Sequence, residues 1–127
     1  MQQLSMKVLP GEYSLCRLSS NESIPSWVFA SAFYTVSKSA DELSIIAESK
    51  FVPGDIKAET GWRILKIEQT LDLALTGITA KFSTALAEVG VNLCVIATYD
   101  TDYVMLKQEK LAIAIPALQK TGIMVNA

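Results

Sequence analysis

The chain contains no histidine among its 127 residues. Histidine is the commonest general acid or base near neutral pH, the usual partner of a serine or cysteine nucleophile, and a frequent zinc ligand. Phosphate-binding loops of the GxxxxGK[ST] and GxGxxG types are also missing from the sequence. These absences argue against most hydrolytic, metal-dependent and nucleotide-dependent enzymes, so we expect a chain that is not an enzyme and uses no cofactor.

Cysteine is scarce as well. Cys16 and Cys94 are the two cysteines of the sequence, and two isolated thiols cannot complete a tetrahedral metal site. Both lie in apolar runs that are typical of strands. We therefore expect both to be reduced and buried. The alternative is a disulfide, which nothing in the sequence favours.

Charge of either sign is limited, and long apolar runs are missing. Charged residues make up 19% of the chain, the net charge is −2, and no cluster of Lys and Arg occurs. Phosphate contacts need a positive surface, so we expect no nucleic-acid partner. No segment reaches the roughly 18 consecutive apolar residues of a membrane span, and the first residues lack the pattern of a signal peptide. We expect a cytoplasmic protein with no membrane partner.

Hydrophobic residues are abundant at 50%, which suffices for a real core in one compact domain or two very small ones. The second half has the clearest periodicity. Helical spacing of apolar residues begins beside Gly77, and Gly90 is typical of a helix C-terminus. The elements that we predict there are strands at 62–68, 91–97, 103–107 and 123–125 and helices at 77–90 and 108–121.

This order of strand, helix, strand, strand, helix, strand is ferredoxin-like, an α+β fold with antiparallel sheets and helices on one face. Pro116 falls inside the second predicted helix. Because its ring cannot donate to the carbonyl of Ala112, we expect a kink or a broken hydrogen bond at that point.

The first half reads as a degenerate copy of the same plan. Strands are predicted at 6–9, 13–18, 33–37 and 43–48, with at most two helical turns at 23–28. The segment 51–61 is the joint between the halves. We therefore predict a tandem repeat, with an N-terminal unit at 1–60 and a C-terminal unit at 61–127.

Polar chemistry gathers at the loop before the helix at Gly77 and at the turn around Asp102. A helix N-terminus offers unpaired N–H groups that suit a carboxylate, and glycine permits close approach to the backbone. Asp100 and Asp102 offer negative charge for an ammonium or guanidinium group, and Thr98 offers a hydroxyl. The alternative is that Gly77 is only a tight helix entry and that both aspartates are ordinary turn residues.

The same segments carry a family resemblance. The loop at Gly77 followed by ALAEVGVNLCVI resembles the ACT domain, a small regulatory module that typically binds an amino acid. GWRILKIEQTLDLALTGI and ATYDTDYVML, with ADELSII upstream, resemble a bacterial two-ACT family and are similar to the CASTOR-type arginine sensors. This chain is half the length of those sensors, so dimerisation would be needed to reach their four units.

The resemblance implies a ligand site where two ACT units meet. The ligand-site residues that the resemblance implies lie in the loop before the helix and in the acidic turn, namely Thr76, Gly77, Ile78, Thr98, Tyr99 and Asp102.

Three functions remain open from the sequence. The first is a regulatory sensor that binds an amino acid, forms a homodimer and acts on a protein partner. The second is an interaction module with the same fold and no ligand. The third is a small enzyme that recruits arginines and carboxylates, which the lack of histidine disfavours.

Overall fold

The computed structural model describes residues 3–71 and 77–127. Contacts divide the chain into two compact units, one formed by the residues up to Pro10 with Arg63–Ala127 and the other by Gly11–Trp62. We call the first the helical unit and the second the inserted unit, because its sequence interrupts the first. Strand β5 (Lys57–Ile67) contributes residues 57–62 to the inserted unit and residues 63–67 to the helical unit.

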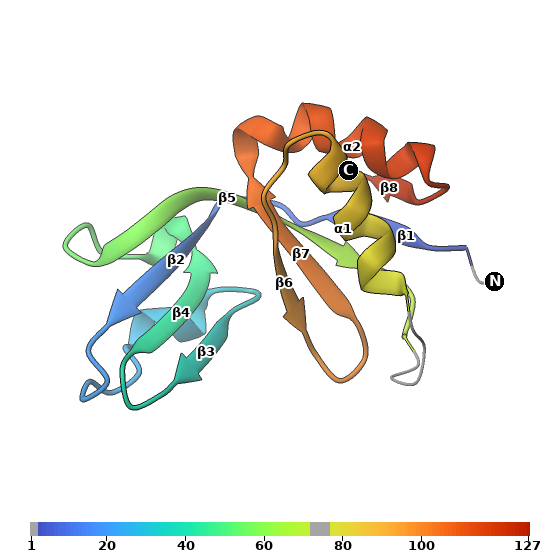
Figure 1. Cartoon of the computed structure of the whole chain (residues 1–127). Helices are drawn as coiled ribbons and strands as arrows, with labels where there is room; N and C mark the ends of the chain where they lie inside the picture. The colour runs from blue at the N-terminus through green and yellow to red at the C-terminus, as the bar shows by residue number, and fades with distance from the viewer. Residues whose placement is uncertain (1–2, 72–76) are drawn as a thin grey trace. The chain divides into compact units, whose positions relative to one another are not determined.

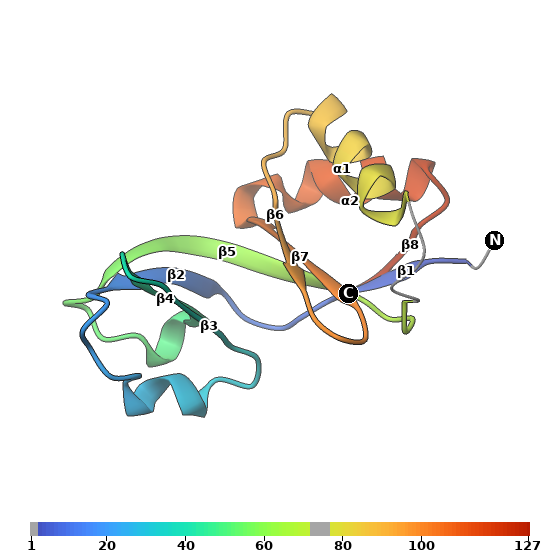
Figure 2. The ribbon, with the colours of Figure 1, turned by 60° about the horizontal axis from the view of Figure 1, so that its bottom comes forward.

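The helical unit is a sheet with two α-helices on one face (Figures 1 and 2). Its strands run in the order β6–β7–β5–β1–β8. From β5 onward the chain has the order strand, helix, strand, strand, helix, strand, which confirms the predicted ferredoxin-like order. The elements of this unit besides β5 are β1 (Ser5–Val8), α1 (Ile78–Glu88), β6 (Cys94–Ala97), β7 (Asp102–Lys107), η3 (Gln108–Lys110), α2 (Leu111–Lys120) and β8 (Met124–Asn126).

Helix α1 forms where apolar spacing and end signals agree. Phe82, Ala85 and Leu86 are its buried residues, and Phe82 and Leu86 pack into the core between helices and sheet. Gly90 has a φ of 74°, and its N–H donates to Ala87 O at 3.0 Å while Val91 N–H donates to Leu86 O at 3.0 Å. This pair of bonds satisfies two of the carbonyls that a helix end leaves free, and a left-handed glycine suits it.

Strand β1 belongs to the helical unit, which corrects the predicted division at residue 60. It pairs antiparallel with β5 and parallel with β8. The sheet is therefore mixed rather than wholly antiparallel. Leu4, Met6 and Val8 enter the core beneath the helices. Burial of these three side chains explains why β1 joins the sheet of the helical unit and not the sheet that contains β2, β3 and β4. That residues 1–60 descend from an ACT-like unit, and so make a tandem repeat, stays a prediction.

The inserted unit is an antiparallel sheet in the order β3–β4–β2–β5. Two short 3-10 helices lie on one face of this sheet (Figure 2). Cys16, Val28 and Ile45 lie at the centre of its apolar core. Its elements besides β5 are β2 (Tyr13–Leu18), η1 (Ser26–Ala30), β3 (Thr35–Lys38), β4 (Leu43–Glu48) and η2 (Ser49–Phe51).

Two further expectations change in the structure. The second helix was predicted from 108, but residues 108–110 form the 3-10 turn η3 and α2 begins at Leu111. Pro116 lies inside α2, and the kink or broken hydrogen bond expected there stays a prediction. Cys94 is exposed, whereas Cys16 is buried as expected. Strand β6 pairs with β7 alone in the described part of the chain, so an apolar strand at the sheet edge leaves a thiol accessible.

No helix within residues 3–71 and 77–127 is both long and apolar enough to cross a membrane.

Candidate functional site

The first turn of α1 begins with a left-handed glycine. Gly77 has a φ of 84° and accepts a hydrogen bond from Lys81 N–H at 3.0 Å. Gly77 has no side chain that could cap the helix, and among residues 3–71 and 77–127 no side chain caps this end. The N–H groups of a first helical turn suit a ligand oxygen. The positive end of the helix dipole favours an anionic group at this point.

The acidic turn between β6 and β7 is closed by its two threonines. Thr98 N–H donates to Thr101 O at 2.9 Å, and the Thr98 hydroxyl donates to the same oxygen at 2.8 Å. Thr101 N–H in turn donates to Thr98 Oγ1 at 3.3 Å. The Thr98 hydroxyl, which the sequence offered as a ligand group, is therefore engaged within its own turn.

Asp102 lies on the helix-covered face of the sheet. Val104 and Leu106 on the same strand enter the core beneath the helices, and alternate residues of a strand share a face. The Thr79 hydroxyl on the first turn of α1 donates to Asp102 Oδ2 at 3.5 Å. This contact joins Thr79 and Asp102, which are 23 positions apart in the sequence, and so brings the Asp102 carboxylate to the start of α1.

The predicted site residues are only partly brought together. Gly77 and Asp102 both lie at the start of α1, where the Thr79 hydroxyl contacts the Asp102 carboxylate. Ile78 packs against the apolar core, and Tyr99 is 85% exposed on the turn. Thr76 lies outside the described residues.

Two functional candidates were missed from the sequence, Thr79 and Thr101. Thr79 lies on the first turn of α1, where a hydroxyl can face a ligand. Its position two residues after Gly77 in the sequence could have identified it as a candidate. Thr101 is buried, with its hydroxyl donating to Ile67 O at 2.9 Å. A buried hydroxyl requires a partner, but the partner comes from β5 and could not be read from the turn itself.

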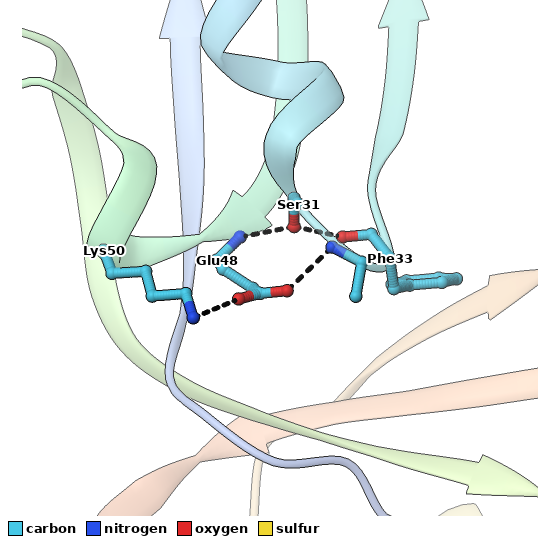
Figure 3. Close-up of polar contacts among 5 residues, drawn as sticks. Ser31, Phe33, Glu48 and Lys50 are labelled. Carbon is cyan, nitrogen blue, oxygen red and sulfur yellow. Dashed lines mark hydrogen bonds and ion pairs between the residues drawn. The ribbon is translucent and has the colours of Figure 1, made fainter.

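The inserted unit has a second polar cluster, drawn in Figure 3. Glu48 N–H donates to Ser31 Oγ at 2.9 Å, and the Ser31 hydroxyl donates to Phe33 O at 2.6 Å. The Glu48 carboxylate accepts from Ala32 N–H at 2.7 Å and lies 3.5 Å from the Lys50 ammonium. Both carboxylate oxygens are occupied, so the cluster fastens the segment between η1 and β3 to β4 and is a poor candidate for ligand binding.

Metal and thiol chemistry are limited. Within the described ranges, no three side chains of His, Cys, Asp or Glu come close enough to hold a metal ion. Burial raises the pKa of the Cys16 thiol, which keeps it protonated and unreactive.

Residues 57–120 match the family model of the ACT domain, and this match spans half of the chain. The chain therefore belongs to the ACT domain family. Residues 11–55 match a second model, which describes an N-terminal domain.

Several solved structures resemble this chain. Protein Atu0741 from Agrobacterium tumefaciens is 27% identical, with a TM-score of 0.91 over 98% of this chain and 93% of that one. Protein VC0802 of unknown function from Vibrio cholerae is 23% identical, with a TM-score of 0.77 over 94% and 91%. The regulatory subunit of aspartate kinase from Thermus thermophilus is 15% identical, with a TM-score of 0.57 over 87% and 91%. Among curated proteins, no relative matches the sequence.

Proposed function

We propose that this chain is a non-catalytic regulatory sensor that binds an amino acid beside the start of α1. Family membership supports a ligand-binding role, since ACT domains typically bind small ligands such as amino acids. The observation that carries the proposal is the contact between Thr79 Oγ1 and Asp102 Oδ2, because it joins the helix start to a carboxylate within one unit.

The chemistry of this arrangement fits a zwitterion. The carboxylate of an amino acid suits the N–H groups of the first helical turn, and its ammonium suits Asp102. Thr79 lies between these two groups and supplies a hydroxyl. Gly77 lacks a Cβ, and an added Cβ would meet no atom of the described residues within 4 Å, which suits close approach of a ligand to the backbone.

Thermal unfolding in the presence of each of the twenty standard amino acids tests this proposal. A ligand at a hundred times its Kd adds about 2.7 kcal/mol to the free energy of unfolding. A domain of this size then unfolds roughly 10 °C higher, since each 1 kcal/mol shifts the melting temperature by about 4 °C. No shift with any amino acid at millimolar concentration would reject the proposal.

A second candidate is an interaction module of the same fold that binds no ligand. It is favoured by strand β6, which pairs with β7 alone in the part of the chain that the structure describes and leaves Val95 39% exposed. An uncharged open strand of this kind suits pairing with another strand. Self-association without any amino-acid effect on melting would support this function over the first.

A further inference from the structure

Thr101 has a buried side chain on an otherwise solvent-accessible turn. It is 5% exposed, whereas Thr98, Tyr99 and Asp100 are all exposed. Its hydroxyl donates to Ile67 O at 2.9 Å, and Ile67 is the last residue of β5 and fully buried. The acidic turn is therefore fastened to β5 by a side chain.

A second bond fastens the same turn to the segment that follows β5. Leu71 N–H donates to Asp100 O at 2.7 Å. Thr98 closes the turn through its N–H and its hydroxyl, both donated to Thr101 O. The main-chain oxygen of Thr101 closes the turn, and its hydroxyl attaches the turn to β5. One residue therefore links the closure of the turn to its attachment.

Asp102 follows directly at the first position of β7. In extended chain, neighbouring side chains point to opposite sides. Thr101 directs its hydroxyl toward β5, and Asp102 directs its carboxylate toward α1, where Thr79 donates to it. The bond of Thr101 to Ile67 O therefore restricts the direction in which the next side chain, that of Asp102, can point.

We infer that Thr101 is a positioning residue for the Asp102 carboxylate. Its hydroxyl bond to Ile67 O holds the turn so that Asp102 faces the first turn of α1. The inference rests on the proposed function to the extent that the ligand uses Asp102. It adds a determinant of affinity that does not itself touch the ligand.

Amide hydrogen exchange without ligand tests the attachment directly. In Thr101→Val the N–H groups of Leu71 and Thr98 should exchange about tenfold faster, which corresponds to one neutral hydrogen bond. Thr101→Ser, which keeps the hydroxyl, should restore nearly wild-type exchange. Thr121→Val is the matched control, because Thr121 also donates its hydroxyl to a main-chain oxygen, Leu118 O at 2.7 Å, at the end of α2. It should leave both amides unchanged.

Ligand affinity supplies the second measurement. The probe is the standard amino acid that raises the melting temperature of the wild-type chain most. Calorimetry should show about tenfold weaker binding for Thr101→Val. The same change made in an Asp102→Asn background should cause no further loss, because Thr101 acts through Asp102.

Unchanged exchange in Thr101→Val would overturn the inference, as would an equal loss of affinity in both backgrounds. Failure of Thr101→Ser to restore exchange would also overturn it. If Thr101→Val does not fold, Thr101→Ala replaces it, since the smaller side chain leaves room for water at Ile67 O. If no amino acid stabilises the wild-type chain, the proposed function fails, whereas the exchange measurement still decides whether Thr101 holds the turn.

Discussion

Asp102 is the side chain on which ligand binding should depend most. Asp102 is half-buried at the start of α1, and its carboxylate is within reach of the Thr79 hydroxyl. A hydrogen bond to a charged group contributes roughly 1.5–3 kcal/mol, so Asp102→Asn should weaken amino-acid binding by about one to two orders of magnitude. Calorimetric titration measures the affinity, and thermal unfolding of the same variant measures the fold.

Asp100→Asn is the matched control for this change. Asp100 lies on the same turn, but its side chain is exposed and its main-chain oxygen makes the described contact, to Leu71 N–H. The control should lose much less affinity than Asp102→Asn. Unchanged affinity in Asp102→Asn, together with a lower melting temperature, would make Asp102 a turn residue only.

The two cysteines should differ in reactivity. Cys94 is exposed on the edge strand β6, while Cys16 is 1% exposed in the core of the inserted unit, where burial raises the pKa of its thiol. Alkylation of the native chain should therefore label Cys94 rapidly and Cys16 slowly, and denaturant should make both fast. Peptide mass spectrometry assigns each label, and Cys94→Ser should abolish the fast phase. Rapid native labelling of Cys16 would contradict its position in the core.

The end of α1 depends on a left-handed residue. Gly90 has a φ of 74°, and an added Cβ would meet no atom of residues 3–71 and 77–127 within 4 Å, so we expect the cost of a side chain to be conformational. Gly90→Ala should lower the free energy of unfolding by roughly 1–2 kcal/mol. Chemical denaturation measures this difference.

Gly54→Ala is the control, because Gly54 lacks a positive φ and also has open space around its Cβ position. It should be neutral or slightly stabilising, by at most about 1 kcal/mol, since alanine restricts the unfolded chain. Equal destabilisation by both substitutions would show that the backbone at Gly90 is not the cause.

Apolar surface left open by the fold predicts that the chain associates with itself. Strand β6 leaves Val95 39% exposed and pairs only with β7 among the described strands, and Ile113 on α2 is 46% exposed. We predict a homodimer at micromolar concentration, seen as a concentration-dependent sedimentation coefficient. Val95→Lys should weaken a dimer that pairs through this edge, since lysine discourages strand pairing.

Ala87→Lys, on the exposed side of α1, is the control and should leave sedimentation unchanged. A monomer at every concentration would contradict the prediction. Persistence of the dimer in Val95→Lys would move the interface away from β6 and toward a helix face.

Much of the helical unit was predictable because its signals are local. Apolar spacing in α1 and the glycines beside it determine where the helix begins and ends, since these effects act over four or five residues. The hairpin of β6 and β7 follows from two apolar runs around a polar turn. Gly77 and Asp102 were identified as site candidates for the same reason, because the N–H groups of a helix start and the negative charge of an acidic turn are local properties.

The sequence by itself thus determined the helices, the hairpin and the chemistry available at each end of them. Only the tertiary structure decided which sheet receives β1, since alternating Leu4, Met6 and Val8 could bury one face against any core. It also decided the exposure of Cys94, which follows from the edge position of β6, and the joining of Thr79 to Asp102 and of Thr101 to Ile67. Strand pairing and both contacts join segments that are distant in the sequence, and no local sequence pattern predicts which segment is the partner.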